Sequence, residues 1–276
     1  MNLDPRLTLA RPDLASQALE GVVRADRFAE AKPMRLVIPA APVRAGASLD
    51  GEQIDQLLFG ERFDVVEIAG GFAWGQAARD GYVGWVEAAA LSPRPLAASH
   101  RVSALRTFAF AEPSIKAPAR GPFSLNALVT VTEVEGALAF AEGAGWMPLG
   151  HLAPVGEAFA DPVETAERFL GAPYLWGGRD SLGIDCSGLI QQALYAAGRA
   201  CPRDSDQQAE LGSPAPIEAL ARGDLVFWRG HVGLMLDGAR LLHANAHHMA
   251  VAIEPLAEAV ARIAAAGRPP AVFRRI

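Results

Sequence analysis

The spacing of apolar residues along the chain changes near residue 161, and this change limits the folds that the chain can adopt. From residue 34 to that point, short apolar runs alternate with Gly, Pro and Asp turns, a pattern typical of small all-β units. After Asp161-Pro162, a helix cap and a first-turn proline, apolar residues recur at helical spacing. Strand patterns return from residue 224 onward. Helices followed by an antiparallel sheet predict an α+β domain that follows all-β units.

The all-β part contains a faint internal repeat. Its first copy ends in a turn and an aromatic strand, residues 80–86, whose last part is Gly84-Trp85-Val86. Gly145-Trp146-Met147 resembles this last part and marks a second copy. Proline-rich joints follow both copies. Upstream of them, apolar residues between Leu14 and Val22 indicate one weak helix face. We therefore expect an N-terminal extension (1–33), two small β units (34–95 and 96–156) and a larger domain (157–276).

Charge and hydropathy exclude several classes of partner. The net charge of −6 and the pI near 5.6 argue against binding to nucleic acid or to an anionic membrane. No apolar run reaches the length of a membrane span, and the first residues, which include Asp4 and Pro5, lack a signal-peptide pattern. We expect a cytoplasmic monomer that acts on a small ligand.

The two cysteines, Cys186 and Cys201, fit a reducing compartment. A disulfide between them is not expected, because a helix from Cys186 to Gly198 would separate them by about 18 Å. Cys186 lies in Gly183-Ile184-Asp185-Cys186-Ser187-Gly188, where a loop becomes a helix. The free amides and the dipole at a helix start favour the thiolate, which is the nucleophilic form. Cys186 is thus the candidate nucleophile, and Cys201 is a candidate core residue.

A thiol nucleophile needs a base, and His231 at the start of a predicted strand is the candidate. It shares a strand face with Gly233, whose small size is expected to leave room for substrate. His243, on the next strand, is expected to orient His231. The two side chains share a face only if the intervening loop has an odd number of residues. A three-residue loop at 236–238, with Gly238 left-handed, would place them directly opposite one another.

Metal and cofactor sites are not expected. His243, His247 and His248 are close in sequence, but they lie on a strand and a loop rather than at helical ligand spacing. His247 and His248 either border the groove of the expected active site or are solvated loop residues. The segment 173–178, rich in glycine and aromatic residues, is either core or substrate floor.

Five motifs follow one another between residues 160 and 276. They are Tyr174-Leu175-Trp176-Gly177-Gly178, Asp185-Cys186-Ser187-Gly188-Leu189, Pro202-Arg203-Asp204-Ser205-Asp206-Gln207-Gln208, Gly223-Asp224-Leu225-Val226-Phe227 and His231-Val232-Gly233, followed by His243-Ala244. In this order they resemble the motifs of the NlpC-type cell-wall cysteine peptidases, which have a papain-like fold. Residues 34–154 resemble two bacterial SH3-like barrels, with a good match in the first copy and a poor one in the second.

This resemblance implies that Cys186 is the nucleophile, His231 the general base and His243 the orienting residue. Family members with SH3-like barrels before the catalytic domain resemble γ-D-glutamyl-L-diamino acid endopeptidases of peptidoglycan stem peptides. In that group an aspartate matching Asp204 binds the free amine of the leading L-Ala, and a tyrosine of the first barrel, which we assign to Tyr82, helps to close the site. The resemblance assigns five positions to the substrate site: Tyr174, Asp185, Ser187, Asp204 and Ser205.

The sequence thus predicts a cysteine peptidase without cofactor that cuts short stem peptides during murein peptide recycling. One alternative is an exported peptidase or amidase that remodels intact peptidoglycan. Another is a catalytically idle module that binds wall peptides, although an intact Cys186, His231 and His243 set argues against it.

Overall fold

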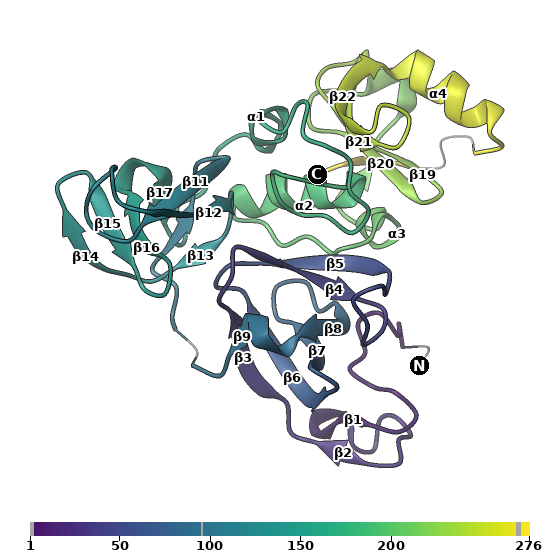
Figure 1. The fold of residues 1–276 in the computed structure, drawn as a ribbon. Helices are drawn as coiled ribbons and strands as arrows, with labels where there is room; N and C mark the ends of the chain where they lie inside the picture. Colours follow the sequence, from purple (N-terminus) through teal and green to yellow (C-terminus); the bar gives the residue numbers. More distant parts are fainter. Residues whose placement is uncertain (1–2, 95, 269–271) are drawn as a thin grey trace. The chain divides into compact units, whose positions relative to one another are not determined.

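The computed structural model describes residues 3–94, 96–268 and 272–276. The chain divides into two compact units, residues 1–155 and 156–276, and each is described by itself (Figure 1). Within the described ranges, no helix has both the length and the apolar character that crossing a membrane requires.

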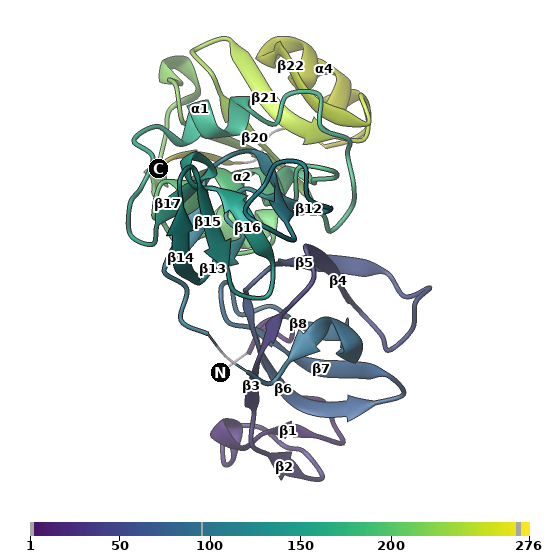
Figure 2. The ribbon, with the colours of Figure 1, turned by 60° about the vertical axis from the view of Figure 1, so that its left-hand side comes forward.

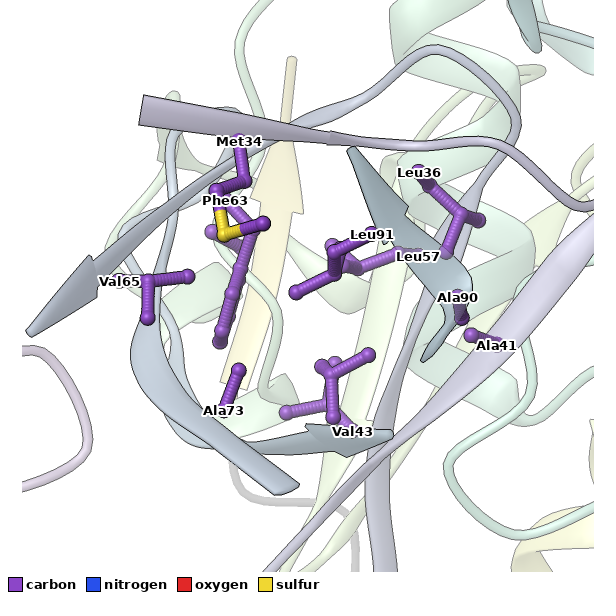
Figure 3. Close-up of a cluster of buried hydrophobic side chains, with 12 residues drawn as sticks. Met34, Leu36, Ala41, Val43, Leu57, Phe63, Val65, Ala73, Ala90 and Leu91 are labelled. Atoms are coloured by element: carbon purple, nitrogen blue, oxygen red, sulfur yellow. The ribbon is translucent and has the colours of Figure 1, made fainter. Parts of the chain in front are cut away.

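The first group of strands in the amino-terminal unit forms a seven-stranded antiparallel sheet in the order β5-β4-β8-β7-β6-β3-β9. Alternate side chains of these strands point inward, and Figure 3 shows Leu36, Val43, Phe63 and Leu91 meeting in the resulting core. The strands are β3 (Lys32–Leu36), β4 (Ala40–Arg44), β5 (Gln53–Leu58), β6 (Arg62–Ala69), β7 (Phe72–Ala77), β8 (Val83–Glu87) and β9 (Leu91–Ser92), with a short 3-10 helix η2 (Ala88–Ala90) before β9.

The second group repeats this strand order. Its five-stranded sheet, β12-β11-β16-β15-β14, corresponds to β5-β4-β8-β7-β6, and its β10–β17 pairing corresponds to β3–β9 (Figure 2). The repeat inferred from the sequence is therefore present as a shared topology. These elements are β10 (His100–Val102), β11 (Arg106–Phe110), β12 (Ala119–Ser124), β13 (Leu128–Val129), β14 (Val131–Glu135), β15 (Leu138–Ala141), β16 (Gly145–Pro148), the 3-10 helix η3 (Leu149–His151) and β17 (Leu152–Pro154).

The helix predicted near the N-terminus is wrong. The segment forms two short parallel strands, β1 (Ala15–Ser16) and β2 (Phe28–Ala29), with one 3-10 turn, η1 (Gln17–Leu19), after β1. Leu14 is fully buried against Trp74, whereas Val22 is 61% exposed. Packing on the first sheet therefore overrides the weak helical pattern.

The carboxy-terminal unit combines helices with a six-stranded antiparallel sheet in the order β18-β23-β19-β20-β21-β22, as the change of period predicts. The predicted last strand, 271–276, begins at a residue outside the described part. The elements are α1 (Pro162–Glu167), α2 (Cys186–Ala196), α3 (Ser205–Gln208), β18 (Ser213–Pro214), η4 (Ile217–Ala219), β19 (Leu225–Trp228), β20 (His231–Met235), β21 (Arg240–Asn245), β22 (Ala250–Pro255), α4 (Leu256–Ala265) and β23 (Val272–Arg275).

Two helices fix the centre of this sheet. Helix α4 buries Ala259 and packs Leu256 and Val260 in a cluster with Met235 and Leu241 of the central strands. Helix α2 packs against β20 and β21, so its first residue is brought close to the strands that carry the two histidines.

The start of α2 is held close to the loop that precedes it. A Cβ atom at Gly188 would overlap the carbonyl oxygen of Gly178, which itself accepts the backbone N–H of Asp185. Glycine at this position therefore permits the close approach of helix and loop.

We expect Gly188→Ala to destabilise the carboxy-terminal unit by about 1 to 3 kcal/mol, because the added methyl group forces helix and loop apart. Faster hydrogen exchange in peptides from α2 would report this change. Gly150→Ala is the matched control, since a Cβ there meets no atom within 4 Å. Equal exchange in both variants would contradict the packing argument.

Candidate active site

Cys186 is the first residue of α2 and is buried, with 5% of its surface exposed. Asp185 precedes it as the helix cap, and its carboxylate accepts the backbone N–H of Gly188 at 2.7 Å. The backbone amides of Val232 and Ser187 both hydrogen-bond the sulfur. The nucleophile therefore lies where the start of α2 meets β20. Both cysteines are free, as predicted, and both are buried, which was expected for Cys201 alone.

The thiol of Cys186 is held in its neutral form. Burial, followed by the negative charge of Asp185, raises its pKa to about 12. The two backbone amides and the charge of Arg203 act in the opposite direction without cancelling this effect. Burial therefore opposes the thiolate that the helix start was expected to favour.

Asp185 joins the nucleophile to a buried ion pair. Its carboxylate receives two bonds from Arg203, at 2.6 and 3.1 Å, and also the backbone N–H of Gly177 at 2.9 Å. Arg203 also donates to the hydroxyl of Ser187 at 2.8 Å. The side chains of Arg203 and Asp185 are 1% and 7% exposed. Asp185 and Ser187 thus organise the loop around Cys186, and their predicted contact with substrate stays a prediction.

With Leu236 opposite Arg240 as the last pair, the turn of the hairpin has three residues, as the odd-length condition requires, but it lies at 237–239 rather than 236–238. Leu234 pairs with Leu242, and Leu236 donates to the carbonyl of Arg240. This register places His231 and His243 on the same face of the sheet. They are diagonal neighbours, offset by two residues, and do not form a directly opposite pair. The turn is built by Asp237, whose carboxylate accepts the N–H groups of residues 239 and 240, and not by a left-handed Gly238.

The diagonal placement still brings the two histidine rings together. Nε2 of His231 lies 2.8 Å from Nδ1 of His243, and Nε2 of His243 lies 2.7 Å from Glu254 on β22. Arg262 of α4 donates two bonds of 2.6 Å to that carboxylate. Three neighbouring strands and the helix beside them therefore hold one continuous chain of hydrogen bonds.

The chemistry of these groups fixes the position of each proton. Glu254, paired with Arg262, is an acceptor only, so Nε2 of His243 must donate to it. Nδ1 of neutral His243 is then an acceptor, and Nε2 of His231 must donate to it. The proton of neutral His231 is thereby held on Nε2, which leaves the lone pair on Nδ1. His231 is in the tautomer that a general base requires.

Both histidines are neutral at pH 7. Burial and the neighbouring His243 lower the pKa of His231 to about 3. Burial lowers the pKa of His243 to about 4, although Glu254 acts in the opposite direction. The resting site is therefore an uncharged thiol and an uncharged imidazole.

Sequence reasoning missed Glu254, Arg262 and Arg203. Glu254 was detectable in part, because it is a lone acidic residue in the short apolar run 250–255. Arg262 and Arg203 carry no such local signal. One is an ordinary helix residue, and the other stands in a recognised motif without an assigned role.

The remaining predicted substrate residues lie in different places. Tyr174 lines a pocket together with His231, and burial, followed by the charge of Cys186, raises the pKa of its hydroxyl. Asp204 caps α3 through a reciprocal capping box with Gln207, and Ser205 is the first residue of that helix. Tyr82 belongs to the other unit, where it is 5% exposed.

The space expected above Gly233 is filled. A Cβ there would contact the side chain of Leu241, so this glycine admits a core residue rather than substrate. The open space lies beside His231, in a pocket of about 410 Å³ that is also bordered by His247 and Trp176. Segment 173–178 therefore contributes to the pocket wall through Tyr174 and Trp176.

Within the described residues, His243, His248 and Glu254 could together offer three metal ligands, with donor atoms within 4.8 Å of one another. Both nitrogens of His243 already have partners, and Arg262 occupies Glu254. A metal ion would have to replace the proton between His243 and Glu254. The absence of a metal cofactor stays a prediction.

Comparison with known proteins matches two parts of the chain. Residues 171–264 match the NlpC/P60 family, and residues 43–91 match the bacterial dipeptidyl-peptidase SH3 domain. A γ-D-glutamyl-L-lysine dipeptidyl-peptidase of Bacillus subtilis is 37% identical over 108 residues, which are 36% of each chain. Dipeptidyl-peptidase 6 of Lysinibacillus sphaericus is 40% identical over 86 residues, which are 30% of this chain and 31% of that protein. The matches thus span about a third of these relatives.

The fold is also that of a solved NlpC/P60 family protein from Bacillus cereus. The two structures superpose with a TM-score of 0.74 over 88% of this chain and 99% of the other, at 20% sequence identity. Sequence and fold agree that this chain joins a bacterial dipeptidyl-peptidase SH3 domain to a carboxy-terminal domain of the NlpC/P60 family.

Proposed function

We propose that the protein is a cysteine peptidase that hydrolyses the γ-D-glutamyl-L-diamino acid bond of short peptidoglycan stem peptides with a free N-terminal L-Ala. The carrying observation is the hydrogen-bond chain that leaves the lone pair of His231 on Nδ1, in a domain whose nucleophile candidate starts the neighbouring helix. The names of the dipeptidyl-peptidase relatives support the choice of bond.

In the proposed reaction, Nδ1 of His231 takes the proton of Cys186 as the sulfur attacks the γ-glutamyl carbonyl. The backbone amide of Cys186 helps to hold the oxyanion. The imidazolium then gives its proton to the leaving amine, and water hydrolyses the thioester by the reverse proton transfers. His243 and Glu254 stabilise the transient charge on His231, because each accepts a hydrogen bond from its neighbour in the chain.

Asp204 is proposed to bind the free amine of the peptide. Its side chain is half-buried, and its place at the start of α3 fixes it within the motif that also supplies Arg203. A fixed carboxylate favours an ammonium group over the neutral amide of an acylated peptide. Tyr174 and Ser205 complete the proposed site in the carboxy-terminal unit, and the contact of Tyr82 with substrate stays a prediction. The protein is proposed to act in the cytoplasm, in the recycling of wall peptides.

The second group of strands is proposed to be a divergent SH3-like barrel. The shared strand order supports this assignment, although the family match covers only the first group. We propose that the protein works as a monomer on small peptides, without nucleic acid or membrane partners.

The function is tested with L-Ala-γ-D-Glu-diamino acid tripeptides that carry lysine or diaminopimelate, each in free and N-acetylated form. We expect cleavage of the free peptides by mass spectrometry, with the acetylated forms about 100-fold slower. Cys186→Ala should abolish turnover and keep peptide binding, and Asp204→Asn should remove the preference for the free amine. Turnover by Cys186→Ala would refute the nucleophile, and equal cleavage of both forms would refute the role of Asp204.

Glu254→Gln should lower kcat by about 10- to 100-fold with little change in KM, because the imidazolium of the transition state loses its charged support through His243. Steady-state kinetics on the free tripeptide measures the effect. Glu258→Gln is the control, since this exposed residue lies on the following helix, α4, without a bond to His243. A rise in KM at constant kcat would show instead that Glu254 shapes substrate binding.

The neutral resting pair predicts how alkylation depends on pH. Because the pKa of Cys186 is raised to about 12, the thiolate fraction grows with pH throughout the accessible range. Labelling by iodoacetamide should therefore speed up about tenfold per pH unit between pH 6 and 9. The Cys186→Ala variant gives the background from Cys201. A rate that stays flat across this range would reveal a preformed thiolate–imidazolium pair.

A further inference from the structure

The pocket beside His231 has a strongly basic lining. It is formed within the carboxy-terminal unit, with walls from Trp176, Trp228 and His231 and three arginines, Arg229, Arg262 and Arg268. Its volume of about 410 Å³ fits a ligand of amino-acid size. Of the described residues, neither Cys186 nor any carboxylate lines it.

The chemistry of the reaction determines which half of the substrate this pocket can hold. His231 must protonate the leaving amine, so the departing diamino acid has to lie against its ring. Trp228 packs beside that ring, with centroids 5.6 Å apart. Asp204, proposed to hold the amino end of the acyl half, lies outside the pocket lining. The pocket is thus placed on the leaving-group side.

The three arginines differ in availability. Arg262 is occupied by Glu254. Arg229 and Arg268 are exposed, and in the described part of the chain no acidic side chain lies within 4.0 Å of either. Two cationic groups therefore face the pocket without a protein counterion.

The backbone at both arginines is fixed by local structure. Arg229 and Gly230 form the two-residue loop between β19 and β20, directly before His231, and Gly230 has a φ of +74°. Arg268 follows a Schellman motif that ends α4, in which its N–H bonds the carbonyl of Ile263 at 3.2 Å and Gly267 has a φ of +77°. The main chain is thus fixed at both positions, and both residues line the pocket.

We propose that this pocket is the leaving-group subsite and that Arg229 and Arg268 bind carboxylates, so that the enzyme prefers a diamino acid whose side chain ends in a carboxylate and an amine. This proposal rests on the proposed function. The α-carboxylate of a tripeptide engages one guanidinium, and the second carboxylate of diaminopimelate engages the other. Lysine offers an ammonium group alone at that end, which the second guanidinium repels.

The test compares kcat/KM for L-Ala-γ-D-Glu-meso-diaminopimelate and L-Ala-γ-D-Glu-L-lysine. The wild-type protein should favour the former about tenfold, and this preference should shrink as salt screens the exposed charges. Arg229→Gln and Arg268→Gln should each lower cleavage of the diaminopimelate peptide and leave the lysine peptide within twofold. Arg199→Gln, an exposed arginine at the far end of α2, should change neither. Equal rates for both peptides, or an equal loss of both in the variants, would overturn the proposal.

A binding measurement separates this proposal from the proposed function. Free meso-diaminopimelate and L-lysine are titrated into the Cys186→Ala protein by calorimetry, alone and combined with each arginine variant. Tighter binding of diaminopimelate that depends on Arg229 and Arg268 supports the subsite even if neither tripeptide is cleaved. Cleavage of the tripeptides without such binding would reject the subsite and retain the peptidase.

Discussion

The ion pair between Glu254 and Arg262 is the constraint on which the proposed chemistry depends. It holds Glu254 as a pure acceptor, and this choice determines in turn the proton of His243 and the proton of His231. Without that charge, either nitrogen of His243 could carry the proton, and the proton of His231 would no longer be held on Nε2. One salt bridge between the sheet and the helix thus fixes the tautomers of both histidines.

A second buried ion pair, between Asp185 and Arg203, fixes the residues around the candidate nucleophile. It joins the helix start, the glycine loop at Gly177 and the hydroxyl of Ser187 in one network. Buried charges are costly unless every group has a partner, and here the carboxylate accepts five hydrogen bonds, two from Arg203 and one each from Gly177, Ser187 and Gly188. The pair contributes a defined geometry around Cys186.

Burial has two opposing effects on this site. It keeps Cys186 and His231 uncharged, because a low-dielectric surrounding disfavours both ions. It also strengthens the hydrogen bonds that would stabilise the ionised forms. These are the bonds from two backbone amides to the sulfur and the chain of bonds from His231 to Glu254. The structure therefore favours proton transfer during attack over a standing ion pair.

The sequence by itself determined the order of the β and α+β parts and the free thiol at a helix start, because these depend on local periodicity. The odd loop between His231 and His243 was only a condition for a shared face, and the strand register of the structure meets it. The exact pairing register of β20 and β21 did not follow from the sequence. The side chain of Asp237 accepts hydrogen bonds that fix the turn one residue later than a turn based on a left-handed Gly238. Glu254 and Arg262 were decided only by the tertiary structure. They act because strand pairing and helix packing bring them to His243, and such contacts leave no pattern in the local sequence.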